Sequence, residues 1–325
     1  MRLTVAFIAL LFHLSRGLIQ VIQVKESDLI PVNKTTRCLE NEVPYPGDVC
    51  TKFGDAFATA YKFLEEHLPS WDLSNAATLG FHSKDDPSVD GLELGVATLG
   101  INISLETKQL RPWAADVPED VYNEYVVTYA HVNEARSNWR AFLTPVIDII
   151  LQSSPPPGPS TVPEVVHLIN SHMWSTGVLG NTVTFKSSQT PLIYDPMSAI
   201  VFGYASCTGV SILFADALRA AGVPARLAGT PAWNGDPNKG NHNWIEVYIE
   251  GEWRFIEAEP AGPGETLDNP CDKWFCSADK MKGTMVYATR WAREGTTYPM
   301  AWDITNTEVP GVNRTEYYQQ ACNAC

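Results

Sequence analysis

The clearest hydrophobic pattern in the chain lies between residues 205 and 224. Apolar residues there recur three and four positions apart, which is the spacing of one face of a helix; they are Val210, Leu213, Phe214, Ala217 and Leu218. Gly222 and Pro224 follow, and both residue types are typical of a helix end. The pattern predicts a buried helix that begins near Cys207.

Short apolar runs flank this helix. Strands are predicted at 182–185 before it and at 225–229 after it. Two more follow: a strand that carries His242 and runs through 245–249, and a strand from Trp253 that ends at 257–260. The last two strands are separated by a Gly251-Glu252 turn. One buried helix packed on an antiparallel sheet makes an α+β core.

The chain before this core is predicted to be mainly helical. The expected helices are 55–68, 118–129, 138–151 and 163–174, and the proline-rich stretch 153–159 separates the last two. Residues 69–116 give a mixed pattern that predicts no single element.

The first residues are typical of a secretory signal. Arg2 supplies a positive charge, an apolar run extends from Leu3 to Leu14, and residues 15–17 are suited to cleavage. The run is shorter than the roughly 20 residues that span a bilayer, although an uncleaved anchor is the alternative. We therefore expect five segments: a signal peptide (1–17), an N-terminal region (18–116), a helical region packed on the core (117–175), the core (176–305) and a C-terminal tail (306–325).

Sequons and cysteines agree with an exported protein. Asn33, Asn102 and Asn313 each begin an Asn-x-Ser/Thr sequon, so they are candidate glycosylation sites. Seven cysteines leave one unpaired in an oxidising compartment. Six of them fall into three couples that are close in sequence, and we expect a disulfide within each couple: Cys38 with Cys50, Cys271 with Cys276, and Cys322 with Cys325. Six cysteines allow 15 connectivities in all. Cys207 is the one left over.

The net charge of −14 argues against nucleic acid and anionic membranes as partners. We expect a protein or peptide substrate and no integral membrane association after signal cleavage. We also expect no cofactor. Asp236 and Asp268 lie in loops and could contact calcium, but no segment resembles an EF-hand loop, so we expect no required metal.

The unpaired cysteine has candidate partners downstream. At the first turn of a helix, backbone N–H groups and the helix dipole stabilise a thiolate. His242 begins one predicted strand, and Glu257 and Glu259 lie at the end of the next. A thiol, an imidazole and a carboxylate in this arrangement are the parts of a nucleophilic site.

Four blocks around these residues resemble the transglutaminase-like superfamily, within the papain-like cysteine fold. They are 205–211 (ASCTGVS), 218–226 (LRAAGVPAR), 240–247 (GNHNWIEV) and 251–253 (GEW) followed by Glu259-Pro260. Weaker resemblance to an exported branch extends over about 117–317. The family resemblance implies that 176–305 is a transglutaminase-like catalytic core.

The resemblance also implies residue roles. Cys207 matches the nucleophile and His242 the general base. The third member is Glu257 or Glu259; we favour Glu259, because Ala258-Glu259-Pro260 resembles the exported branch. Asn241 and Trp244 beside His242 are candidate substrate-binding residues, Trp244 being equally a core aromatic. The Cys207 N–H is expected in an oxyanion hole, with Gln189 or Trp174 as candidate side-chain donors.

These observations predict a secreted Cys-His-Glu enzyme that acts on amide bonds through an acyl-thioester, by hydrolysis or acyl transfer. The alternative is a catalytically silent binding or scaffold protein of the same fold. A third interpretation, a disulfide-rich adhesive or receptor domain, requires Cys207 to be paired.

Overall fold

The computed structural model describes residues 53–81, 95–188 and 193–325 in full. It also gives the backbone of four short strands near the N-terminus, β1 (Ala9–Phe12), β2 (Ile19–Ile22), β3 (Thr35–Cys38) and β4 (Val43–Pro46). The expected signal cleavage, the Asn33 sequon, the Cys38–Cys50 couple and the Gln189 side chain fall outside what the structure describes.

The second half of the chain contains a six-stranded antiparallel sheet, with the strand order β11-β12-β10-β7-β8-β9. Its strands are β7 (Ala225–Thr230), β8 (His242–Ile249), β9 (Glu252–Ile256), β10 (Tyr287–Thr289), β11 (Thr296–Thr297) and β12 (Pro310–Asn313). Glu250 and Gly251 join β8 to β9 with φ of 51° and 94°, as the tight turn of a two-residue hairpin requires. The register pairs Thr230 with His242, which sets the start of β8 beside the end of β7.

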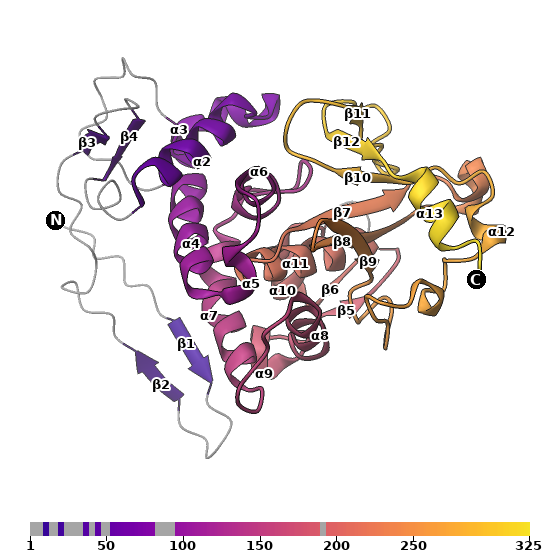
Figure 1. Cartoon of the computed structure of the whole chain (residues 1–325), viewed down its shortest axis with the longest axis horizontal. Coiled ribbons are helices and arrows are strands. Elements are labelled where there is room, and N and C mark those ends of the chain that lie inside the picture. The colour runs from indigo at the N-terminus through magenta and orange to yellow at the C-terminus, as the bar shows by residue number, and fades with distance from the viewer. Residues whose placement is uncertain are drawn as a thin grey trace.

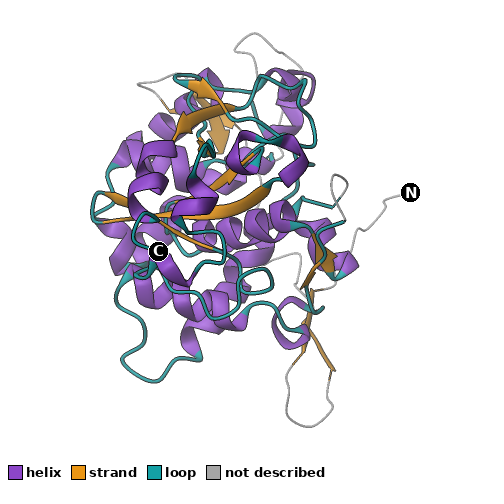
Figure 2. Ribbon diagram, turned by 90° about the vertical axis from the view of Figure 1, so that its right-hand side faces the viewer, coloured by secondary structure: helices purple, strands orange, loops and turns teal. Residues whose placement is uncertain are grey.

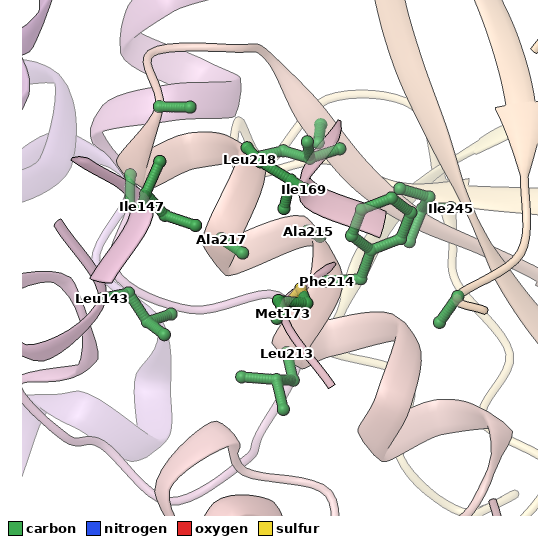
Figure 3. Close-up of a cluster of buried hydrophobic side chains, with 14 of the residues drawn as sticks. Leu143, Ile147, Ile169, Met173, Leu213, Phe214, Ala215, Ala217, Leu218 and Ile245 are labelled. Carbon is green, nitrogen blue, oxygen red and sulfur yellow. The ribbon is translucent and has the colours of Figure 1, made fainter. Parts of the chain in front are cut away.

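Helix α11 (Cys207–Ala220) packs on β7 and β8, and all of its residues are buried. Helices α7 (Trp139–Gln152) and α8 (Val162–His172) pack on its other side. Figure 3 shows the resulting core, in which side chains of α7 and α8 meet those of α11 and Ile245 of β8. A helix surrounded by protein explains why its sequence is apolar on nearly every face.

The remaining helices lie mostly on the side of the molecule away from the sheet (Figure 1). They are α2 (Asp55–Glu66), α3 (Ala76–Leu79), α4 (Val96–Leu110), α5 (Pro112–Ala115), α6 (Glu119–Tyr122), α9 (Thr176–Leu179) and α10 (Pro196–Phe202). Two short strands, β5 (Thr184–Phe185) and β6 (Tyr204–Ala205), pair in parallel just before α11. After β9 come α12 (Ala278–Met281) and α13 (Thr315–Ala321). Figure 2 shows that the strands of the sheet gather in one part of the molecule, with helices around them.

The α+β class and the antiparallel sheet are confirmed. The predicted helix over 118–129 ends earlier, because α6 passes into one π-helical turn, Asn123–Val127. Helix α4 lies within the stretch for which the sequence predicted no single element. None of the described helices is both long enough and apolar enough to cross a membrane.

The predicted pairing of the C-terminal cysteines is wrong. Cys271 bonds to Cys325 and Cys276 to Cys322, with Cα–Cα distances of 5.2 and 4.9 Å. Both bridges join the segment after β9 to the end of α13, because Cys276 and Cys322 share one hydrophobic cluster with Tyr318 of that helix. The bridges therefore tie together segments 54 and 46 residues apart rather than closing local loops.

Candidate active site

Cys207 is the first residue of α11 and the free cysteine among the described residues. The residue is 9% exposed. The sulfur accepts hydrogen bonds from the backbone N–H groups of Thr208 and Asn243, and it is also hydrogen-bonded to the His242 side chain. Burial raises the pKa of the Cys207 thiol, but these hydrogen bonds and the charge of His242 outweigh it, so the pKa is lowered overall.

His242, the first residue of β8, links the thiol to a carboxylate. Its Nε2 is hydrogen-bonded to Oε1 of Glu257, which leaves Nδ1 for Cys207. Burial lowers the pKa of His242, but the hydrogen bonds to Cys207 and Glu257 prevail and raise it to about 9. A lowered thiol pKa beside a raised imidazole pKa favours a thiolate–imidazolium pair at neutral pH.

The carboxylate beside His242 belongs to Glu257, so our preference for Glu259 is wrong. Extending the β8–β9 register would place Glu259 opposite His242. The strand instead ends at Ile256, and the chain turns at once, with the N–H groups of Ala261 and Gly262 bonded to the carbonyl of Ala258. The Glu259 carboxylate accepts from the N–H of Gly264 inside this turn, away from the imidazole.

Several groups hold the side chain and backbone of Glu257 in place, and the residue is only 1% exposed. Its Oε2 accepts from Nε1 of Trp274 at 3.1 Å. Asn170 of α8 donates to the Glu257 carbonyl at 3.0 Å and accepts from the Glu259 N–H at 2.8 Å. The Glu257 N–H donates to Glu265 Oε2 at 3.1 Å. The carboxylate is thus held by α8, by the turn after β9 and by the disulfide-bridged segment that carries Trp274.

Asn243 ties the first turn of α11 to the sheet. Its Oδ1 accepts from Oγ1 of Thr208 at 2.7 Å, and its Nδ2 donates to the Tyr298 hydroxyl at 2.5 Å. Tyr298 is fully buried, and burial raises its pKa above the ordinary range, so its hydroxyl stays neutral. Because the Asn243 N–H also contacts Cys207, this network holds Cys207 and the start of β8 in register.

Two candidate contacts have structural partners instead. Trp244 is fully buried, stacks on Phe275 at 4.4 Å between ring centroids and donates to Tyr318 at 2.7 Å. It therefore belongs to the core and not to a substrate contact. Trp174 donates from Nε1 to Asn170 Oδ1 at 3.3 Å, so its indole N–H is already used. Asn241 is exposed just before β8, and its contact with substrate stays a prediction.

The sequons and the candidate metal ligands differ in their surroundings. Asn313 is exposed at the end of β12, whereas Asn102 lies half-buried inside α4, a placement that does not suit a glycan. Asp236 accepts from the backbone of Asn238, and Asp268 pairs with Arg254. Within the described ranges, no group of three His, Cys, Asp or Glu residues is placed to hold a metal ion.

Sequence patterns missed Asn170, Glu265 and Trp274. None lies in a block of the resemblance, and their contacts with Glu257 cross 87, 8 and 17 positions of the chain. The Cys-x₄-Cys spacing around Trp274 was the one available signal that this segment is held in place.

Comparison with known families adds a match centred on this site. Residues 170–258 match the model of the transglutaminase-like superfamily. This part of the chain is transglutaminase-like. The transglutaminase-like region begins at Asn170 and ends one residue after Glu257, so it contains Cys207, His242 and Glu257. No curated protein matches the chain.

Several solved structures are similar to parts of the chain at low identity. One is a proposed cysteine protease from Cytophaga hutchinsonii, with 15% identity and a TM-score of 0.34, covering 63% of this chain and 68% of the other. A proposed protease from Parabacteroides distasonis has 14% identity and a TM-score of 0.30, with coverage of 49% and 29%. A third, a TGase, has 18% identity and a TM-score of 0.29, with coverage of 41% and 35%. The chain thus spans about a third of the length of the last two.

Proposed function

We propose that this chain is a transglutaminase-like cysteine enzyme that acts on amide bonds of a protein or peptide through an acyl-thioester. The observation that carries the proposal is the hydrogen-bonded series from Cys207 through His242 to the buried carboxylate of Glu257. Groups with perturbed pKa values cluster at functional sites, so a buried thiol whose pKa is lowered favours the enzyme over the silent scaffold.

The geometry supports the following steps. The Cys207 thiolate attacks the carbonyl carbon, while the imidazolium of His242 gives its Nδ1 proton to the departing nitrogen. The C–N bond breaks, an amine or ammonia leaves, and the acyl group stays on sulfur. Neutral His242 then takes a proton from water or a second amine, which attacks the thioester and restores the thiolate. Glu257 holds the ring and stabilises its charge throughout.

Export from the cell is part of the proposal. Two disulfides among the described residues and an unpaired Cys207 fit an oxidising compartment. The apolar segment 3–14 supports a secretory route, and the exposed Asn313 is the sequon best placed to carry a glycan.

The test is acyl-enzyme formation. The protein is mixed with glutamine-containing peptides, with and without a primary amine, and intact mass and ammonia release are followed. We expect a peptide adduct on the wild type and none on Cys207→Ala. Product carrying the amine would establish transfer, and free acid alone would establish hydrolysis. A reactive thiol that forms no acyl adduct with peptide or protein amides would favour the silent scaffold.

A further inference from the structure

A second carboxyl group, that of Glu265, is buried beside Glu257. Glu265 follows the turn that ends β9 and is 6% exposed. Burial of two neighbouring carboxyl groups is unfavourable unless one of them keeps its proton or both are paired. The mechanism above gives Glu265 no task, so its position needs an explanation.

The contacts between the two residues use both oxygens of Glu265. Its Oε2 accepts the backbone N–H of Glu257 at 3.1 Å, and the two side chains are also hydrogen-bonded to each other. Glu265 Oε1 and Glu257 Oε2 both lie within 2.6 Å of the point where a Cβ on Gly262 would sit. Two carboxyl groups can share a hydrogen bond only when one of them is protonated, so a bond between these side chains requires a hydrogen on one oxygen of the pair.

The charges around the pair decide which carboxyl keeps the proton. Glu257 faces His242, whose raised pKa favours the imidazolium, and it accepts a hydrogen bond from Trp274. Burial of Glu265, together with the nearby charge of Glu257, raises the pKa of Glu265 to about 8. Lys273 opposes this only weakly, because its Nζ is already bonded to Asp272 and to the carbonyls of Thr266 and Asn269. On the remaining side, Glu259 is turned toward Gly264.

We propose that Glu265 is a positioning residue that acts as a neutral carboxyl, donating from Oε1 to Glu257 Oε2 while accepting the Glu257 N–H on Oε2. This clamp fixes the Glu257 side chain with Oε1 toward His242. Loss of the proton would place two carboxylates side by side and release Glu257 from this orientation. The inference rests on the proposed function, since it concerns the same triad.

A glutamine at position 265 tests the clamp sharply. Its amide has one acceptor oxygen and one NH2 group that donates, so it can make the same two hydrogen bonds as the protonated carboxyl at every pH. We compare Glu265→Gln with Glu265→Ala, using Glu252→Gln on the exposed start of β9 as the matched control. The rate of Cys207 alkylation by iodoacetamide is measured from pH 5 to pH 10, and the His242 ring resonance is followed by NMR over the same range.

We expect Glu265→Ala to slow alkylation at pH 6 by about 10-fold, the size of a lost hydrogen bond to a charged group, and Glu265→Gln to stay within about 2-fold of wild type by the same argument. The His242 resonance should show its own titration near pH 9 in every protein. The wild-type and Glu252→Gln proteins should show a further inflection near pH 8, absent from Glu265→Gln. A glutamine variant as slow as the alanine variant, or one with the same further inflection as wild type, would overturn the inference.

The two proposals fail in different ways. A wild-type Cys207 that does not react at pH 6 would contradict the proposed function. The His242 resonance would still decide on Glu265, because it reports the neighbouring charge without any reaction at the thiol. If Glu265→Ala does not fold, as judged by circular dichroism, the isosteric glutamine variant alone decides.

Discussion

The third member of the proposed catalytic triad is decided by where β9 stops. Glu257 and Glu259 are two positions apart and would share one face of a continued strand. The turn at 258–262 separates them, placing one carboxylate on His242 and the other on the N–H of Gly264. A difference of two residues therefore decides which carboxylate orients the imidazole.

Replacing each glutamate by glutamine checks this assignment. We expect Glu257→Gln to lower the turnover of an amide substrate by about 100-fold or more, in the range for loss of an acid–base partner, because the amide cannot stabilise the imidazolium. Glu259→Gln keeps an acceptor for Gly264 and should behave like wild type. Steady-state rates at pH 7 measure both, and equal losses in the two variants would contradict the assignment.

In the proposed mechanism, the His242 proton sets the alkaline limit of the reaction. Its pKa is raised from 6.5 to about 9, so the proton that the leaving nitrogen needs is present at neutral pH and is lost as pH rises through about 9. The same shift adds stability that is complete below pH 6.5 and lost through pH 9. We expect amide turnover to fall along this limb. A limb near pH 6.5 in the wild-type profile would show that the imidazolium is not stabilised.

At the scale of elements, two disulfides hold the segment 271–276 against α13. Trp274 projects from this segment, 52% exposed, and its ring lies 5.0 Å from that of His242 while its N–H reaches Glu257. The bridges thus fix a residue of the site to the C-terminal helix. The Cys276–Cys322 bridge is buried, whereas Cys271 and Cys325 are exposed.

Removal of the buried bridge should affect both stability and the site. We expect the double variant Cys276→Ser/Cys322→Ser to lose about 3–4 kcal/mol of unfolding free energy, the scale for a loop of this length, and to react more slowly at Cys207. Denaturant unfolding and alkylation at pH 6 measure the two effects. Cys271→Ser/Cys325→Ser is the exposed counterpart. A Cys276–Cys322 variant with unchanged alkylation would show that Trp274 is positioned without the bridge.

The sequence predicted those elements that their own hydrophobic pattern and end signals define. The helix at Cys207 and the strand at His242 follow from apolar periodicity and end signals, and these residues were placed correctly. Helix α4 was missed because Thr98, Gly100 and Ser104 are weak helix formers, and tertiary burial stabilises them. The disulfide pairing and the choice of Glu257 depend on where distant segments meet, and no local pattern reports that.

At the scale of the whole molecule, the helical region and the sheet share one core. Side chains of α7 and α8 pack on α11, whose opposite face meets β8 (Figure 3). Arg219 of α11 adds polar links, donating to Thr128 Oγ1 at 2.9 Å and to the carbonyl of Ala130 at 3.2 Å. The position of Cys207 therefore depends on packing across both halves.

Two isoleucines of α7 provide a matched test of this dependence. Ile147 is fully buried and Ile149 is 51% exposed. We expect Ile147→Ala to cost about 2–5 kcal/mol of unfolding free energy and Ile149→Ala to stay within about 0.5 kcal/mol of wild type. The whole chain from α7 to β9 should lose structure in one transition. Thermal unfolding is followed by circular dichroism and by Cys207 reactivity. Two signals that change at different temperatures would contradict a single transition.

The central claim is that His242 and Glu257 activate Cys207, and one measurement tests it most directly. Wild type and His242→Ala are treated with iodoacetamide at about pH 6, where an ordinary thiol of pKa about 8.5 is nearly inert, and intact mass is recorded over time. We expect one fast adduct on Cys207 in the wild type and none in the variant. Equal rates in both proteins, or no adduct in either, would contradict it.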